Sequence, residues 1–143
     1  MNTKWLTAIG MTAVLLTAGF AVTSCGPKGP TTVRVVEDEW SVKPDATSVP
    51  AGKVTFQIAN QGKIEHELVV LKTDLAATAL KMRAADPTKV DEEAGAKNVG
   101  EVEDVAAGAS KSETFDLAPG KYMLVCNVSG HYKSGMVAAF EVK

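Results

Sequence analysis

Hydrophobic and polar residues alternate along most of the chain after residue 31, which is the pattern of strands with one face in a core. The alternating stretches are separated by short turns rich in Gly, Pro and Asn. They cover residues 33–35, 40–42, 54–58, 64–70, 102–105, 114–117, 121–126 and 136–142. Seven or so short strands at near-regular spacing predict an all-β fold, an antiparallel Greek-key β-sandwich.

Residues 73–98 depart from the alternation and predict a small helical insertion. A helix capped by Asp74 and stopped by Pro87 would place three apolar side chains on one face: Leu75, Ala79 and Met82. Residues 88–97 predict a second short turn or helix. We expect the insertion to pack its apolar face on the sandwich. The alternative is a lid near the functional site that recognises a partner.

The N-terminal 30 residues predict export. Lys4 precedes an uncharged apolar stretch, residues 5–22, which is followed by small residues and Cys25. This is the pattern of a secretory signal peptide, and the residues up to Cys25 resemble a bacterial lipobox. The chain therefore divides into a signal peptide of lipoprotein type, a lipidated tether and a single domain: residues 1–24, 25–30 and 31–143.

The exported domain is expected on the periplasmic or cell-surface side of the membrane, anchored by the lipid on Cys25. Two alternatives remain open at this point. Residues 5–22 are just long enough to stay in the bilayer as an uncleaved anchor. In an oxidising compartment Cys25 could also form a disulfide with Cys126.

Four metal donors stand out in the domain. A loop between two predicted strands contains Cys126, His131 and Met136, with four residues between successive donors. The only other histidine is His66, and a period of two places it on the apolar face of its strand, with Ile64, Leu68 and Val70. A thiolate, two imidazoles and a thioether are the donor set of a mononuclear electron-transfer copper site.

These residues resemble the cupredoxins, the small blue copper proteins that include plastocyanin, azurin, rusticyanin and auracyanin. The resemblance covers residues 31–143. Its specific parts are the Asn60-x-Gly62 turn before His66, the Pro119-Gly120-x-Tyr122 run before Cys126, and the ligand loop itself. The loop spacing of four and four is most similar to rusticyanin and auracyanin.

The resemblance implies one type 1 copper ion, with His66, Cys126 and His131 as equatorial ligands and Met136 as the axial ligand. Asn127 would lie in the second shell of the site, with a hydrogen bond across to the first ligand segment. One departure concerns the residue after the first histidine. Azurin and some relatives have asparagine or serine there to tie the two ligand segments together, whereas this chain has Glu67.

The resemblance also implies a single-electron carrier that exchanges electrons with extracytoplasmic redox partners. Its partners would dock transiently at an apolar patch around His131, and we expect the protein to be a monomer. The net charge of −2, with mixed signs, indicates no nucleic-acid partner. The alternative is a copper-trafficking or buffering protein, although the Met-rich or His-rich tracts usual for that role are absent from the sequence.

The histidine count argues against an enzyme. Copper nitrite reductases and multicopper oxidases need further histidines for their other copper centres, and both histidines of this chain are already used. A Cys–His nucleophile pair would require an oxyanion hole and a pocket, for which the sequence offers no other signal.

Overall fold

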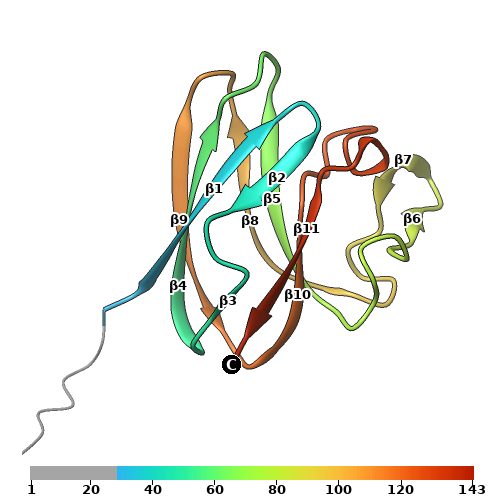
Figure 1. Ribbon diagram of the computed structural model, residues 1–143. Helices are drawn as coiled ribbons and strands as arrows, with labels where there is room; N and C mark the ends of the chain where they lie inside the picture. Colours follow the sequence, from blue (N-terminus) through green and yellow to red (C-terminus); the bar gives the residue numbers. More distant parts are fainter. Residues whose placement is uncertain (1–28) are drawn as a thin grey trace, which may run out of the picture.

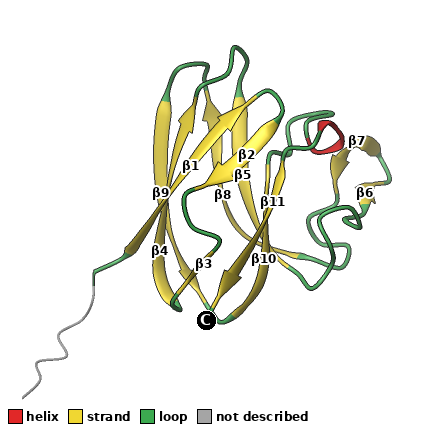
Figure 2. Ribbon diagram, viewed as in Figure 1, coloured by secondary structure: helices red, strands yellow, loops and turns green. Residues whose placement is uncertain are grey.

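The computed structural model describes residues 29–143 as two β-sheets packed face to face (Figure 1). The described residues are almost entirely strands, turns and loops, with one short 3-10 helix (Figure 2). The elements are β1 Thr31–Asp38, β2 Ser41–Pro44, β3 Ser48–Val49, β4 Gly52–Asn60, β5 His66–Lys72, β6 Met82–Arg83, β7 Asp86–Val90, β8 Lys97–Val105, β9 Ser110–Leu117, β10 Gly120–Val125, η1 Tyr132–Ser134 and β11 Val137–Val142. The all-β prediction is confirmed.

The two sheets of the sandwich have different sizes. One has four strands in the order β2-β1-β4-β9, and the other has five in the order β3-β11-β10-β5-β8. Most neighbours pair antiparallel, as expected, but β1 pairs parallel with β4 and β11 pairs parallel with β3. The sheets are therefore mixed, and the expectation of purely antiparallel pairing is wrong at these two pairs.

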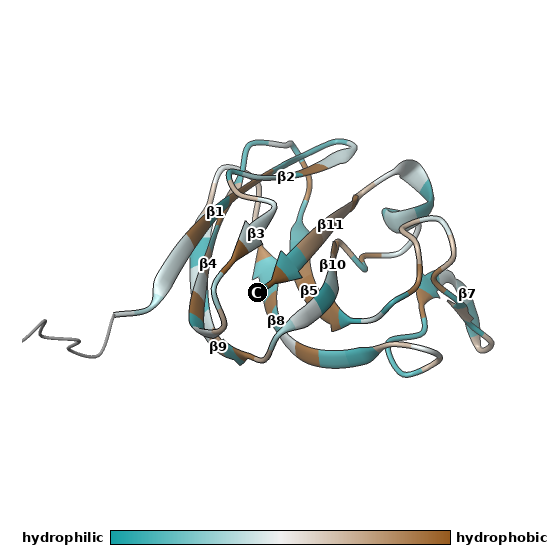
Figure 3. Ribbon diagram, turned by 60° about the horizontal axis from the view of Figure 1, so that its bottom comes forward, coloured by the Kyte–Doolittle hydropathy of each residue, from teal (hydrophilic) through white to brown (hydrophobic). Residues whose placement is uncertain are grey.

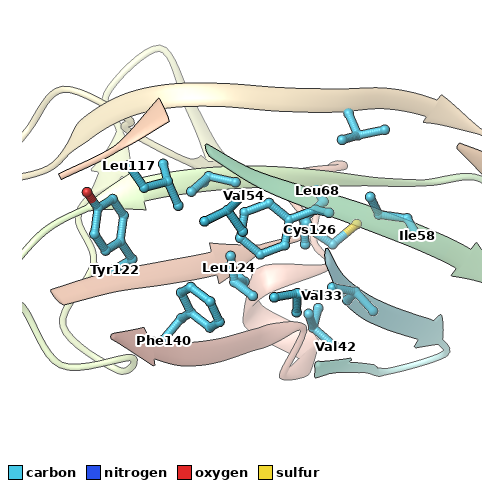
Figure 4. Packing of buried hydrophobic residues seen from close by; sticks show 14 of the residues in the cluster. Val33, Val42, Val54, Ile58, Leu68, Leu117, Tyr122, Leu124, Cys126 and Phe140 are labelled. Carbon is cyan, nitrogen blue, oxygen red and sulfur yellow. The ribbon is translucent and has the colours of Figure 1, made fainter. Parts of the chain in front are cut away.

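The interior between the sheets is filled by the alternating apolar residues that the sequence predicts. Along β4, for example, Val54, Phe56 and Ile58 are fully buried, while the residues between them face outward. This alternation is visible as bands of apolar and polar colour along strands such as β4 (Figure 3). Cys126 belongs to the same cluster, and Figure 4 shows its sulfur among the buried side chains, near Leu68. One end of the core thus leads directly into the ligand loop.

A second apolar cluster covers the outer face of the five-stranded sheet. Its members from the sheet are Val69, Leu71, Met123 and Val125, and its members from the insertion are Leu80 and Val90. Strands β5 and β10 are therefore buried on both faces, which explains their nearly continuous apolar runs.

The predicted helical insertion is wrong in its secondary structure. Between β5 and β8 the chain forms turns and a small hairpin of β6 and β7, which stands beside η1 in Figure 1. Pro87 lies within β7 and does not stop a helix. Buried Thr73 organises the first turn, because its hydroxyl accepts the Leu75 N–H at 3.1 Å and donates to the Gly95 carbonyl at 2.8 Å. This local hydroxyl bonding competes with the helix that Asp74 was expected to cap.

The predicted packing of the insertion is nevertheless confirmed. Leu75 and Met82 are partly buried against the second cluster. The most buried side chains of the insertion are Val90 and Leu80, and both lie outside the helical stripe that the sequence suggested. Tertiary burial of Leu80 and Val90 thus overrides the weak helix propensity of this short segment.

The predicted signal peptide, Cys25 and most of the tether lie outside the described residues. Within residues 29–143, no helix has the length and hydrophobicity needed to cross a bilayer. Cys126 is a buried free thiol, and its partner in the disulfide alternative, Cys25, lies outside the described residues.

Candidate metal centre

His66 is the first residue of β5 and is completely buried. The loop before it is held by Asn60, whose amide donates to the carbonyls of Ile64 at 2.7 Å and Val105 at 2.8 Å. The Asn60 side-chain oxygen also accepts the Gly62 N–H at 2.8 Å. The predicted Asn60-x-Gly62 turn therefore positions the first histidine. Ile64, expected on the inner face with His66, precedes the strand and is 41% exposed.

The other donors lie on one loop that backbone hydrogen bonds close. Cys126 N–H donates to the Met136 carbonyl at 3.1 Å, and Met136 N–H donates to the His131 carbonyl at 3.2 Å. His131 N–H in turn donates to Val128 at 2.9 Å. The turn after η1 requires Gly135, whose φ of 109° is in the left-handed region. Four residues between successive donors are thus enough to bring the loop back on itself.

Three predicted donors converge in the structure. The Nδ1 atoms of His66 and His131 are 3.2 Å apart, and the Cys126 sulfur lies 3.7 Å from the first and 3.3 Å from the second. In a trigonal site with metal–ligand bonds of about 2.0–2.3 Å, donors lie about 3.5–3.8 Å from one another. Among the described residues these three form the one such group of His, Cys, Asp and Glu donors. The observed separations of 3.2, 3.3 and 3.7 Å are close to these values, so a single small metal ion fits after a slight opening of the group.

The fourth predicted donor, Met136, is fully buried in the same apolar cluster as Cys126. It lies immediately before β11, and its backbone is hydrogen-bonded to both Cys126 and His131. The structure thus places the thioether residue at the closing end of the loop. Two imidazoles, one thiolate and a thioether form a His-Cys-His-Met site for a type 1 copper ion.

Burial controls the protonation of the donors. It raises the pKa of the Cys126 thiol to about 12, although backbone hydrogen bonds from Glu67 and Val128 act in the opposite direction. Burial also lowers the pKa values of His66 and His131. The imidazoles are thus kept neutral and available to a metal, while a metal must displace the thiol proton.

Glu67 is the residue at which this chain departs from azurin. A backbone hydrogen bond from Glu67 acts to lower the pKa of the Cys126 thiol, so this residue still interacts with the second ligand segment. The carboxyl is half-buried on the outer face of the sheet, where desolvation raises its pKa and Lys89 opposes that shift.

Asn127 has other partners than the sequence suggested. Its side-chain oxygen accepts the Val90 N–H at 2.6 Å, and its amide donates to the Val90 carbonyl at 3.2 Å and to Glu92 at 2.7 Å. All three bonds go to the insertion, and none of the hydrogen bonds of this side chain reaches the first ligand segment. Asn127 therefore braces the ligand loop against β7.

Sequence reasoning missed two residues of the β1–β2 turn, Glu39 and Trp40. The Trp40 ring meets His131 edge to face at a centroid distance of 5.2 Å and is 48% exposed, although alternation suggested that it faced inward. A Glu39 carboxylate oxygen lies 3.7 Å from His66 Nε2. Both residues reach the site only through the pairing of distant strands, for which the local sequence carries no signal.

Comparison with known proteins agrees with this geometry. The sulfocyanin (SoxE) domain matches residues 46–143. The chain is 37% identical over 120 residues to the copper-resistant cuproprotein CopI of Rubrivivax gelatinosus, covering 81% of this chain and 68% of that protein. It is 30% identical over 92 residues to sulfocyanin of Sulfolobus acidocaldarius, covering 63% of this chain and 46% of that protein.

Among solved structures, reduced auracyanin from Roseiflexus castenholzii superimposes with a TM-score of 0.61 at 24% identity. The match covers 80% of this chain and 99% of auracyanin. This similarity shows the β-sandwich fold.

Proposed function

The chain belongs to the sulfocyanin (SoxE) domain family of cupredoxins, and from that premise we propose that it is a type 1 copper electron-transfer protein. Blue copper proteins of this kind bind one copper ion and are electron-transfer carriers. For this chain we assign the ligands as His66, Cys126, His131 and Met136. The observation that carries the assignment is the convergence of two Nδ1 atoms and the buried sulfur at one point.

The bound copper would supply a one-electron couple, and the protein residues keep its surroundings constant. His66 and Cys126 sit at the ends of strands that are buried on both faces, and the loop is closed by its own backbone. Donors on such a frame move little when the charge of the ion changes, which favours fast electron exchange. We therefore assign the rigidity of the five-stranded sheet a direct role in the function, and no catalytic residue is proposed.

Transient docking of redox proteins is proposed at the surface beside His131. The His131 side chain is only 5% exposed, because the Trp40 ring packs against it. An aromatic side chain in van der Waals contact with a ligand and half-exposed to solvent offers an exit for the electron. Trp40→Ala should slow electron transfer to a partner while the visible spectrum stays unchanged. A changed spectrum would mean that Trp40 supports the ligand geometry.

Copper handling is the second candidate function. It is favoured by the 37% identity to a protein named for copper resistance. Against it, the methionines of the domain are isolated, at Met82, Met123 and Met136, so no Met-rich tract accompanies the site. A protein that only stores or delivers copper has no need for rapid exchange between its oxidised and reduced forms.

Voltammetry and electron self-exchange distinguish the two functions. A carrier shows a reversible one-electron couple, and mixtures of its oxidised and reduced forms show fast self-exchange by NMR line broadening. An irreversible couple, or loss of copper from the protein on reduction, would favour copper handling over electron transfer.

Export and lipid anchoring remain part of the proposal, based on the signal-peptide pattern and Cys25. Cells supplied with labelled palmitate should incorporate the label into the wild-type protein and not into Cys25→Ser. A wild-type protein without label that stays in the membrane fraction would favour the uncleaved anchor.

A further inference from the structure

The turn between β1 and β2 contacts both histidines of the proposed copper site. Trp40 packs edge to face on His131, and the residue before it, Glu39, directs its carboxylate toward His66. These two residues belong to the four-stranded sheet, which contributes none of the four ligands.

His66 needs a partner on the side of the ring that faces away from the site. Its Nδ1 points to Cys126 and His131, so Nε2 must hold the ring proton when Nδ1 donates to a metal. Nε2 is fully buried, and it is the one buried side-chain nitrogen of the described residues without a hydrogen bond. A Glu39 carboxylate oxygen lies 3.7 Å from Nε2, so that a small movement of either side chain would bring the two atoms to hydrogen-bond distance.

The Glu39 carboxylate is held in place by backbone hydrogen bonds. The same oxygen, Oε1, accepts the backbone N–H of Lys63 at 2.7 Å and of Ile64 at 3.1 Å. These hydrogen bonds are the main reason that the pKa of Glu39 is lowered, so the group is ionised. The carboxylate thereby connects the β1–β2 turn to the loop that leads into His66.

Gly62 leaves the space for this carboxylate. A Cβ at that position would lie 2.5 Å from Glu39 Oε1 and 2.8 Å from its Cδ, closer than van der Waals contact allows. A side chain as small as alanine would therefore push the carboxylate away from His66. The glycine at position 62 is therefore a second observation, independent of the charge of Glu39, which indicates that the position of this carboxylate beside His66 is part of the site.

We propose that Glu39 is a positioning residue that accepts the Nε2–H of His66, fixes the ring with Nδ1 toward the copper, and stabilises the oxidised ion. A carboxylate behind a ligating imidazole orients the ring and makes its other nitrogen more basic. The negative charge favours Cu(II) over Cu(I), because the oxidised ion has the larger positive charge. Glu39 thus lowers the reduction potential. This inference rests on the proposed copper site.

The test compares Glu39→Gln with Asp38→Asn. Asp38 offers a matched control, since it has the same charge one residue earlier, but its oxygens bond to Ser41 and Lys43 instead of His66. Removal of a carboxylate partner of a ligating histidine typically weakens metal affinity about 10–100-fold. For Glu39→Gln we expect Cu(II) affinity to fall about tenfold more than Cu(I) affinity, which raises the potential by about 59 mV. Asp38→Asn should change the potential by less than half as much.

Equal shifts for both variants would overturn the proposal, because the effect would then be a general loss of negative charge. No shift for Glu39→Gln would overturn it as well. If Glu39→Gln does not fold, Gly62→Ala provides the same test with the charge retained: it should displace the carboxylate and raise the potential in the same direction. An unchanged potential in that variant would contradict the positioning role.

A measurement without copper separates this proposal from the proposed function. In the copper-free protein, nitrogen-15 NMR of the His66 ring should show the tautomer with the proton on Nε2. Glu39→Gln should shift the ring toward a mixture of tautomers, and Asp38→Asn should not. If the wild-type protein has this tautomer but fails to form a type 1 copper site, the proposed electron-transfer function is wrong, whereas the contact between Glu39 and His66 is supported. A mixture of tautomers in the wild-type protein would contradict the contact itself.

Discussion

The two sheets share one interior, yet they differ on their outer faces. The four-stranded sheet exposes polar residues of β1, β4 and β9 to solvent. The five-stranded sheet is covered by the insertion, so that Leu71 and Val125 on its outer face are as buried as any core residue. The first sheet is typical of an antiparallel sandwich, and the second has the burial pattern of a sheet in a layered α/β protein.

This difference extends to the metal centre. The ligands His66, Cys126 and Met136 lie at the ends of strands in the doubly covered sheet, where packing on both faces restricts their movement. The four-stranded sheet contributes Glu39 and Trp40, which surround the histidines without binding the metal. We infer that one sheet holds the ligands and the other adjusts their environment.

The largest predicted effect concerns Glu37 on β1, the one buried acid of the four-stranded sheet. It is fully buried and neither carboxylate oxygen has a hydrogen bond. Burial, with a smaller contribution from Glu67, raises its pKa from 4.5 to about 8. A raised pKa means that the folded state keeps the proton longer than the unfolded state. Stability is therefore greatest below pH 4.5 and is lost as the pH rises to about 8, by at most about 5 kcal/mol.

Glu37→Gln should remove this loss, so the variant should be more stable than the wild-type protein at pH 8 and similar to it at pH 4.5. Urea unfolding of the copper-free proteins at both pH values checks the prediction. Glu113→Gln, at an exposed position on β9 of the same sheet, is the control and should keep the wild-type pH profile. A wild-type profile in Glu37→Gln would show that another group causes the pH dependence.

The comparison of outer faces is tested directly by Leu71→Ala and Gln57→Ala. Leu71 lies on the outer face of β5 under the insertion, and its truncation should cost about 3 kcal/mol of unfolding free energy. Gln57 lies on the exposed outer face of β4, and its truncation should cost less than about 0.5 kcal/mol. Chemical denaturation measures both. Similar small costs would mean that the insertion does not cover the sheet in solution.

The smallest predicted effect concerns the contact between the insertion and the ligand loop. Asn127→Ala removes three hydrogen bonds and leaves the buried N–H and C=O of Val90 unpaired, which should cost about 2 kcal/mol. Ser129→Ala, in the same loop, removes an exposed hydrogen bond to Thr88 and should cost under about 1 kcal/mol. Equal losses of unfolding free energy in the two variants, measured by thermal or urea unfolding, would show that the Asn127 contact is no stronger than a surface hydrogen bond.

The strands and the ligands could be predicted from the sequence because both depend on local patterns. The period of two places His66 and Cys126 on inner faces, and the turn at Asn60 and Gly62 precedes the first ligand as expected. The position of Met136 follows from the length of the loop. These features need only the residues within one strand and one turn.

The remaining features depend on contacts between distant segments. The insertion is folded by burial of Leu80 and Val90 on the outer face of the five-stranded sheet, far from them in the sequence. The continuous apolar runs in β5 and β10 were a usable signal, since a strand buried on both faces needs a cover. Glu39 reaches His66 through the parallel pairing of β1 with β4, which no local pattern specifies.

The visible spectrum of the copper-loaded protein tests the central claim most directly. The domain from Gly26 onward is loaded with Cu(II), and the absorption is recorded before and after addition of ascorbate. Our account predicts an intense band in the red from charge transfer between the Cys126 thiolate and copper, lost on reduction and absent in Cys126→Ser. A weak, pale spectrum that is the same in Cys126→Ser would contradict the type 1 site and with it the electron-transfer function.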